Sequence, residues 1–259
     1  MRRALSQLWL GCTAYARVLP LFGRLGLWRY VALTGLIALA LLLAALPLAY
    51  FVADATVQWI MSAHQLYASG VHPLLTNLAV FGVMLGLLAL FALVYKHVLL
   101  VAAGPWMGAV AERVSAHYTE LHGGFAVPRQ AGAPKGGSAA RSIRLNARLL
   151  GKETLVSLPL LVASVVPFVN VASTALLFVT QSFYVGVGAL DYSAERERDY
   201  RSSIAFFNEH KALATGVGIG FVLLLLTGVG VLLAPAWSAA AGAWAYAKTS
   251  TPLTRSPSG

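Results

Sequence analysis

The sequence has few charged side chains. Only 11% of its 259 residues are Asp, Glu, Lys or Arg, whereas a soluble globular domain carries about 25%. Hydrophobic residues make up 58%, and the mean hydropathy is +0.73. This composition excludes an ordinary soluble domain and is typical of a polytopic membrane protein.

Residues that usually carry chemistry are also scarce. Cys12 is the only cysteine, so an intrachain disulfide is impossible. The six histidines form no metal-ligand pattern, and no Walker A loop occurs. We therefore expect no enzyme, no metal site and no cofactor, and no transport driven by intrinsic ATP hydrolysis.

Acidic residues are half as common as basic ones. The sequence has nine Asp and Glu residues and 19 Lys and Arg residues, which gives a formal net charge of +10. On a membrane protein, this excess indicates basic cytoplasmic loops and contact with anionic membrane lipids. No basic stripe with interleaved aromatic residues lies outside the apolar segments, so we expect no nucleic-acid partner.

Two long uncharged stretches predict spanning helices. They cover residues 30–53 and 73–95, with 24 and 23 residues, and a spanning helix needs about 20. We expect the first helix to end at Asp54. The apolar character of the second continues to residue 111, so this helix either extends or bends at 104–105.

Two further uncharged stretches, 154–190 and 212–247, are too short to cross a membrane twice. The first is interrupted at Pro167 and Asn170, and the second at the glycines and proline of 228–235. We expect each to enter the bilayer and turn back as a helical hairpin. Backbone that turns inside a membrane must be covered by protein or line a watery cavity. Broken helices of this kind form solute sites, which favours transport.

The remaining segments complete a single membrane domain over residues 1–247. They are an interfacial lead (1–29), a flexible loop rich in Gly, Ala and Pro (121–141), a charged connector (191–211) expected as an amphipathic helix or a loop, and a polar tail (248–259). Residues 142–153 show a helical pattern, with Arg144, Arg148 and Lys152 at four-residue spacing. The predicted loop at 54–72 has no Lys or Arg, and the basic residues lie in the other connecting segments. The positive-inside rule then predicts both termini in the cytoplasm.

Four segments carry a resemblance to a known family. They read GLWRY at 26–30, AAGPW at 102–106 with AERV at 111–114, VPFVN at 166–170 and ALDY at 189–192. In order and spacing they resemble the CysZ-type sulfate permeases, which are related to the eukaryotic etoposide-induced membrane proteins. The resemblance implies an all-α integral membrane fold with two long transmembrane helices plus two helical hairpins that partly penetrate the bilayer. It also implies a homo-oligomer and sulfate uptake across the bacterial inner membrane for cysteine biosynthesis.

The segment before the first spanning helix is the candidate anion site. In the sulfate members, a Gly-Leu/Ile-Arg-Arg sequence there is associated with sulfate. Gly26, Leu27 and Arg29 match it, and Trp28 stands where the first Arg would be. Free N–H groups at the start of a helix favour an anion, and Arg29 can add a bidentate contact. The alternative is that Arg29 anchors the helix at the lipid headgroups, with Trp28 and Tyr30 as its aromatic belt.

Other charged and polar residues are candidates for a pore or a charge network. They are Lys96, Glu112, Arg113, Asp191, Tyr192, Arg196 and Arg201. Because an anion pore needs a net positive lining, the mixed signs favour salt bridges that hold the hairpins in register. Lys96 is either an intramembrane functional cation or a side chain that snorkels to the interface.

Three glycine pairs with four-residue spacing predict close helix packing, within the chain or between copies. They are Gly82 and Gly86, Gly104 and Gly108, and Gly216 and Gly220.

The sequence favours an inner-membrane anion channel or permease with sulfate or another small anion and membrane lipids as its partners. Two alternatives stay open. One is a non-transporting scaffold or lipid-organising protein of the same fold, and the other is a channel for a different solute.

Overall fold

The computed structural model describes residues 2–63, 73–122, 139–164, 166, 168–228 and 230–250. These residues form helices joined by short turns and contain no strand, which confirms the predicted all-α class. The helices are α1 (Arg2–Arg24), α2 (Trp28–Ala63), α3 (Pro73–Leu121), α4 (Ala139–Ala163), α5 (Asn170–Glu197), α6 (Tyr200–Glu209), α7 (Lys211–Leu226) and α8 (Gly230–Ser250).

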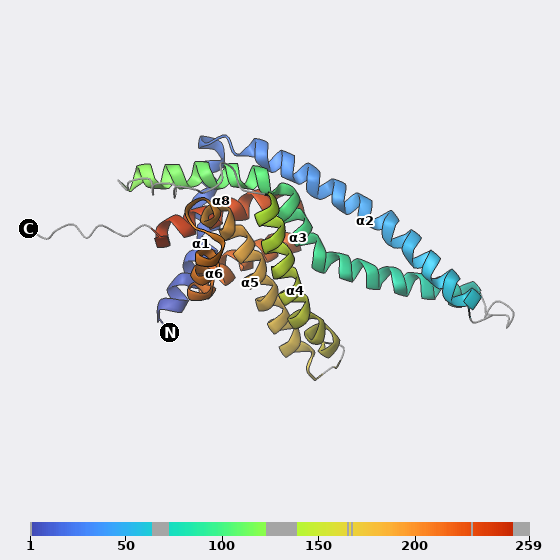
Figure 1. The fold of residues 1–259 in the computed structure, drawn as a ribbon. Helices are drawn as coiled ribbons and strands as arrows, with labels where there is room; N and C mark the ends of the chain where they lie inside the picture. The colour runs from blue at the N-terminus through green and yellow to red at the C-terminus, as the bar shows by residue number, and fades with distance from the viewer. Residues whose placement is uncertain are drawn as a thin grey trace, which may run out of the picture.

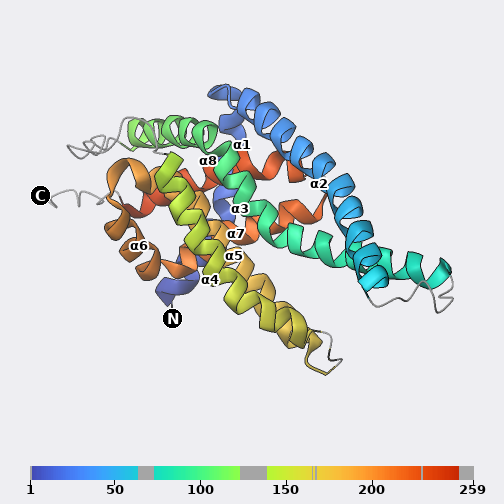
Figure 2. The same cartoon turned by 45° about the vertical axis from the view of Figure 1, so that its right-hand side comes forward.

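Two helix pairs project from a central body. The pair α2 and α3 extends to one side, and the pair α4 and α5 extends in another direction, while α1, α7 and α8 pack in the middle (Figures 1 and 2). Apolar side chains on the projecting pairs are exposed. Phe168, in the turn between α4 and α5, is 99% exposed, and Leu155 is 77% exposed. Such a surface suits contact with lipid.

By length and composition, two helices among the described residues can cross a membrane. They are Trp28–Ile60 of α2 and Asn170–Glu197, which is the whole of α5. The expected end of the first span at Asp54 is wrong, because α2 continues to Ala63. Gln58 donates a hydrogen bond to the Asp54 carboxylate at 2.8 Å, one turn further along the same helix.

The second predicted span, 73–95, lies within α3, but most of its side chains are outside the described residues. The structure does show that α3 continues through Pro105 as one helix of 49 residues. It changes direction along its length (Figure 2). The predicted continuation of the helix past 104–105 is therefore confirmed, although the helix is not straight (Figure 2).

The helices of the first predicted hairpin are longer than expected. Its arms are α4, with 25 residues, and α5, with 28 residues, joined by a turn that ends at Val169. The uncharged stretch 154–190 is only part of the two arms, because α4 begins in the basic segment and α5 runs on into the predicted connector 191–211. Several of the charged residues outside this stretch have ion-pair partners in the fold, among them Arg141, Asp191 and Arg196.

The second predicted hairpin consists of α7 and α8. The chain turns at Gly228, whose φ of +72° is favourable for glycine. The expected break at Pro235 is wrong, because Pro235 lies inside α8. At its other end α7 meets α6 at 87°.

Glycine residues on α7 allow this helix to pack closely against both α1 and α5. A Cβ placed on Gly216 would come within 2.3 Å of the Leu8 carbonyl oxygen in α1, and one placed on Gly218 within 1.6 Å of the Ser182 carbonyl oxygen in α5. The predicted packing role is therefore confirmed within the chain for the pair that includes Gly216. At Gly82 and Gly108 a Cβ would meet no described atom within 4 Å.

Candidate functional site

The turn between α1 and α2 is held in a fixed conformation. The Leu27 amide donates to the Phe22 carbonyl at 2.9 Å, the Gly26 amide donates to the Gly23 carbonyl at 3.4 Å, and Gly26 has a φ of +62°. This is the Schellman pattern of helix termination, in which glycine adopts the left-handed conformation. Because Leu27 is fully buried, the turn is anchored and α2 begins at Trp28.

Two arginines from distant segments meet at this turn. Arg29 donates a hydrogen bond to the Tyr30 hydroxyl at 3.1 Å, and its guanidinium lies 4.9 Å from the centroid of that ring. Arg113, on α3, donates to the Leu25 carbonyl at 3.0 Å, and its guanidinium lies 5.4 Å from the same ring centroid. We call these residues, with Gly26, the α1–α2 site.

The α1–α2 site has a positive electrostatic character. The Tyr30 and Val31 amides donate to the Leu27 carbonyl at 2.9 and 3.3 Å, so among the first four amides of α2 those of Trp28 and Arg29 are the ones left for an anion. The positive end of the helix dipole lies there. The carboxylate of Glu112, next to Arg113 in sequence, pairs with Arg196 of α5 at 3.1 Å. Trp28 packs against Phe22, with ring centroids 5.5 Å apart. Trp28 carries no charge, so the second guanidinium at this turn, beside that of Arg29, is supplied by Arg113.

A buried ion pair joins α4 to α5. The Arg141 guanidinium lies 3.2 Å from the Asp191 carboxylate, and the two side chains are only 13% and 6% exposed. Arg141 also donates to the Arg198 carbonyl at 2.8 Å and to the Ser203 hydroxyl at 2.9 Å. Sequence analysis missed Arg141 because it ends the segment predicted as a flexible loop, 121–141.

Tyr192, which follows Asp191, holds α5 against α3. Its buried hydroxyl donates to the Leu100 carbonyl at 2.6 Å. Leu100 lies shortly before Pro105, which lacks an amide hydrogen and weakens the regular bonding of the preceding turn. Asp191 and Tyr192 therefore act on helix packing and do not face an open site.

The other predicted network residues lie apart from each other. Glu112 and Arg196 form the partly exposed pair described above. Arg201 is exposed in the first turn of α6, where its backbone amide donates to the Asp199 carboxylate at 3.3 Å. Lys96 belongs to α3, but its side chain is outside the described residues.

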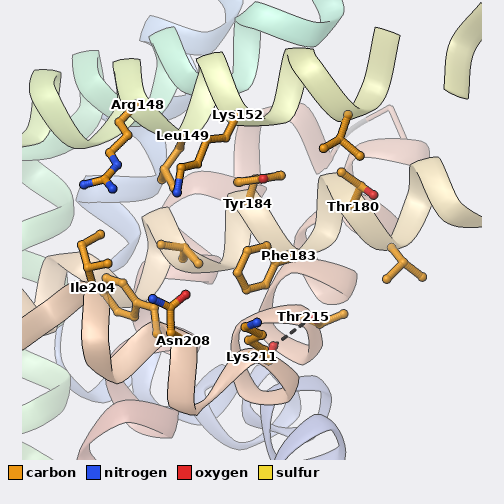
Figure 3. Close-up of a pocket in the computed structure, with 14 residues that line it drawn as sticks. Arg148, Leu149, Lys152, Thr180, Phe183, Tyr184, Ile204, Asn208, Lys211 and Thr215 are labelled. Atoms are coloured by element: carbon orange, nitrogen blue, oxygen red, sulfur yellow. Dashed lines mark hydrogen bonds between the residues drawn. The ribbon is translucent and has the colours of Figure 1, made fainter. Parts of the chain in front are cut away.

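A pocket of about 470 Å³ lies between α4, α5, α6 and α7. Arg148 and Lys152 point into it from α4, Lys211 stands at the start of α7, and Asn208 projects from α6 (Figure 3). None of the residues that line it is acidic, and its other walls are largely apolar. We call it the cationic pocket.

One part of this pocket shows a pattern in the sequence. The four-residue spacing of Arg144, Arg148 and Lys152 places these cations on one helix face. No local pattern links them to Lys211, which the packing of α7 brings to the same pocket. No group of three or more His, Cys, Asp or Glu among the described residues is arranged to hold a metal ion.

One family model matches most of the chain. No curated protein matches the chain significantly. A family model described as "Sulfate transporter CysZ/Etoposide-induced protein 2.4" matches residues 14–247, which runs from α1 into α8. The chain therefore belongs to the sulfate transporter CysZ/etoposide-induced protein 2.4 family of membrane proteins.

Proposed function

We propose that this protein is a channel or permease of the bacterial inner membrane that takes up a small oxyanion, sulfate above all, for cysteine biosynthesis. The observation that carries the proposal is the meeting of Arg29 and Arg113 at Tyr30, beside the first turn of α2. The family match supports a transport role of this kind.

The chemistry of the α1–α2 site suits a tetrahedral dianion. Unpaired amides at a helix start and guanidinium groups are the donors that sulfate and phosphate groups select in proteins. Arg29 is exposed, so solvent screens its charge. Screening keeps the affinity modest, which suits conduction, because an ion must also leave the site.

The membrane arrangement is part of the proposal. The hairpins α4–α5 and α7–α8 partly penetrate the bilayer, both termini lie in the cytoplasm, and the protein assembles as a homo-oligomer. The exposed apolar residues Phe168 and Leu226, near the two hairpin turns, support penetration. The anion moves down its gradient or together with protons.

The decisive experiment measures radiolabelled sulfate flux into proteoliposomes. The variants are Arg29→Ala and Arg113→Ala, and the matched control is Lys248→Ala, which removes an exposed cation at the end of α8. We expect both arginine variants to lose flux and the control to keep it. If folded and inserted protein carries no sulfate above empty liposomes, the sulfate proposal is wrong, and a different solute or a scaffold role takes its place.

A further inference from the structure

The cationic pocket is a second candidate binding site, separate from the α1–α2 site and independent of the transport proposal. Its volume of about 470 Å³ lies within the range of small-molecule pockets, roughly 300–1,000 Å³. Its cations come from α4 and α7, and its apolar side chains come from α4, α5 and α6 (Figure 3). A ligand that fills it must therefore be amphipathic.

The polar end selects a negative charge. Arg148, Lys152 and Lys211 line it, and no described acidic group lies within salt-bridge distance of any of them. Arg148 does contact Tyr200, whose hydroxyl accepts a hydrogen bond at 3.3 Å, but this neutral group leaves the charge uncompensated. All three side chains are exposed, so solvent screens part of their mutual repulsion, and an anion between them would offset the rest.

Two acidic residues lie adjacent to the pocket but outside its lining. Glu153 follows Lys152 on α4, but it is fully buried and does not line the cavity. Glu209 is exposed at the end of α6 and also lies outside the lining.

The apolar end continues into a surface that suits lipid. Along α4, Arg148, Lys152 and Val156 follow one another at one-turn intervals, so the pocket changes from charged to apolar over two turns. Val156 and Val179, on facing arms of the α4–α5 pair, are both exposed. This gradient corresponds to the change from lipid headgroup to acyl chain.

We propose that the cationic pocket binds an anionic phospholipid. Arg148, Lys152 and Lys211 hold the headgroup phosphate, and one acyl chain lies along Val156 and Val179. The inference rests on charge complementarity, because basic side chains near a membrane surface attract anionic lipids, and on the continuity of the pocket with an exposed apolar helix pair.

The test uses delipidated full-length protein in detergent, titrated with phosphatidylglycerol or phosphatidylcholine and followed by native mass spectrometry. The test variant is Arg148→Gln/Lys152→Gln/Lys211→Gln, and the control is Lys248→Gln, an exposed cation outside the pocket. We expect the triple variant to bind phosphatidylglycerol about a hundredfold more weakly. The control should bind it as the parent does, and phosphatidylcholine should bind weakly to all three proteins.

Three further measurements separate the alternatives. If glycerol phosphate or inorganic phosphate displaces the lipid at similar concentrations, the acyl chain contributes nothing and the pocket is a small-anion site. If Lys152→Glu, a single exposed substitution, leaves lipid binding unchanged, the headgroup assignment is wrong. If the triple variant loses its oligomeric state with unchanged lipid binding, the pocket is an interface between copies. Each of these three results overturns the lipid proposal.

Discussion

Arg141 and Asp191 form an ion pair of 3.2 Å that is almost completely buried, although the two residues lie on different helices and neither is next to another buried charge in sequence. Arg141 also bonds the Arg198 carbonyl and the Ser203 hydroxyl, so one side chain connects α4, α5 and α6. The pair therefore holds these three helices together.

Removal of the Arg141 side chain should strongly destabilise the protein. Arg141→Met leaves the Asp191 carboxylate buried without its ion-pair partner, and we expect the free energy of unfolding to fall by about 3–5 kcal/mol. Denaturation in detergent, followed by circular dichroism, measures the effect.

The matched control for this prediction is the exposed pair of Glu112 and Arg196. The Glu112 side chain is 63% exposed, so Glu112→Gln should change stability by less than about 1 kcal/mol. Equal losses in Arg141→Met and Glu112→Gln would contradict the structural role of the buried pair.

The hydrogen bond from Tyr192 to Leu100 should stabilise the contact between α5 and α3. Tyr192→Phe keeps the ring but leaves the buried Leu100 carbonyl without this donor, so we expect a loss of about 1–2 kcal/mol. Tyr50→Phe is the control, because Tyr50 is half-exposed on α2. The interpretation fails if both variants unfold at the same denaturant concentration as the parent.

Substitution of Gly218 should separate α5 from α7. The added methyl group of Gly218→Ala would overlap the Ser182 carbonyl, so the helices must move apart and the melting temperature should fall. Gly108→Ala places the same group where no described atom lies within 4 Å. We expect it to be stabilising by about 0.5–1 kcal/mol, because alanine favours a helix more than glycine does. A lower melting temperature for Gly108→Ala than for Gly218→Ala would refute this account of the packing.

An added guanidinium at position 28 should strengthen anion binding. Trp28→Arg places a third cation at the turn where Arg29 and Arg113 meet, and we predict higher sulfate affinity by isothermal titration calorimetry. Trp59→Arg is the control, because it adds the same charge near the other end of α2. If both variants bind sulfate as the parent does, the turn is not the anion site.

The single cysteine reports on the contact between α1 and α7. The Cys12 thiol lies 3.4 Å from the Gly216 carbonyl oxygen, and burial raises the pKa of this thiol. A raised pKa means that less thiolate is present at a given pH, so maleimide labelling of Cys12 should be slower than that of an exposed cysteine. The labelling rate should begin to rise only at a higher pH than the rate of an exposed cysteine does.

A variant tests this interpretation of Cys12. The methyl group of Gly216→Ala would overlap the Leu8 carbonyl, so α1 should loosen and Cys12 should label faster. Gly82→Ala, where a Cβ meets no described atom within 4 Å, should leave the labelling rate unchanged. Faster labelling in the control alone would contradict the proposed contact.

Much of the local structure follows from the sequence. Runs of apolar residues predict the helices, because a helix that spans the bilayer needs about 20 apolar residues. Gly26 and Gly228 mark turns, since both adopt positive φ values that other residues avoid. The expected helix end at Asp54 was wrong, because its carboxylate accepts a hydrogen bond from Gln58 one turn further along the same helix. Beyond the uncharged stretch 154–190, α4 and α5 continue to Arg141 and Asp191, which pair with each other.

The sequence by itself determined the class of the protein, its apolar segments and the family resemblance, because these depend on composition and on patterns within a few turns of chain. The tertiary structure alone decided which charges meet. It brings Arg113 to Arg29, Lys211 to Arg148 and Arg141 to Asp191. Electrostatic interactions depend on distance in space, and the packing of distant helices sets that distance.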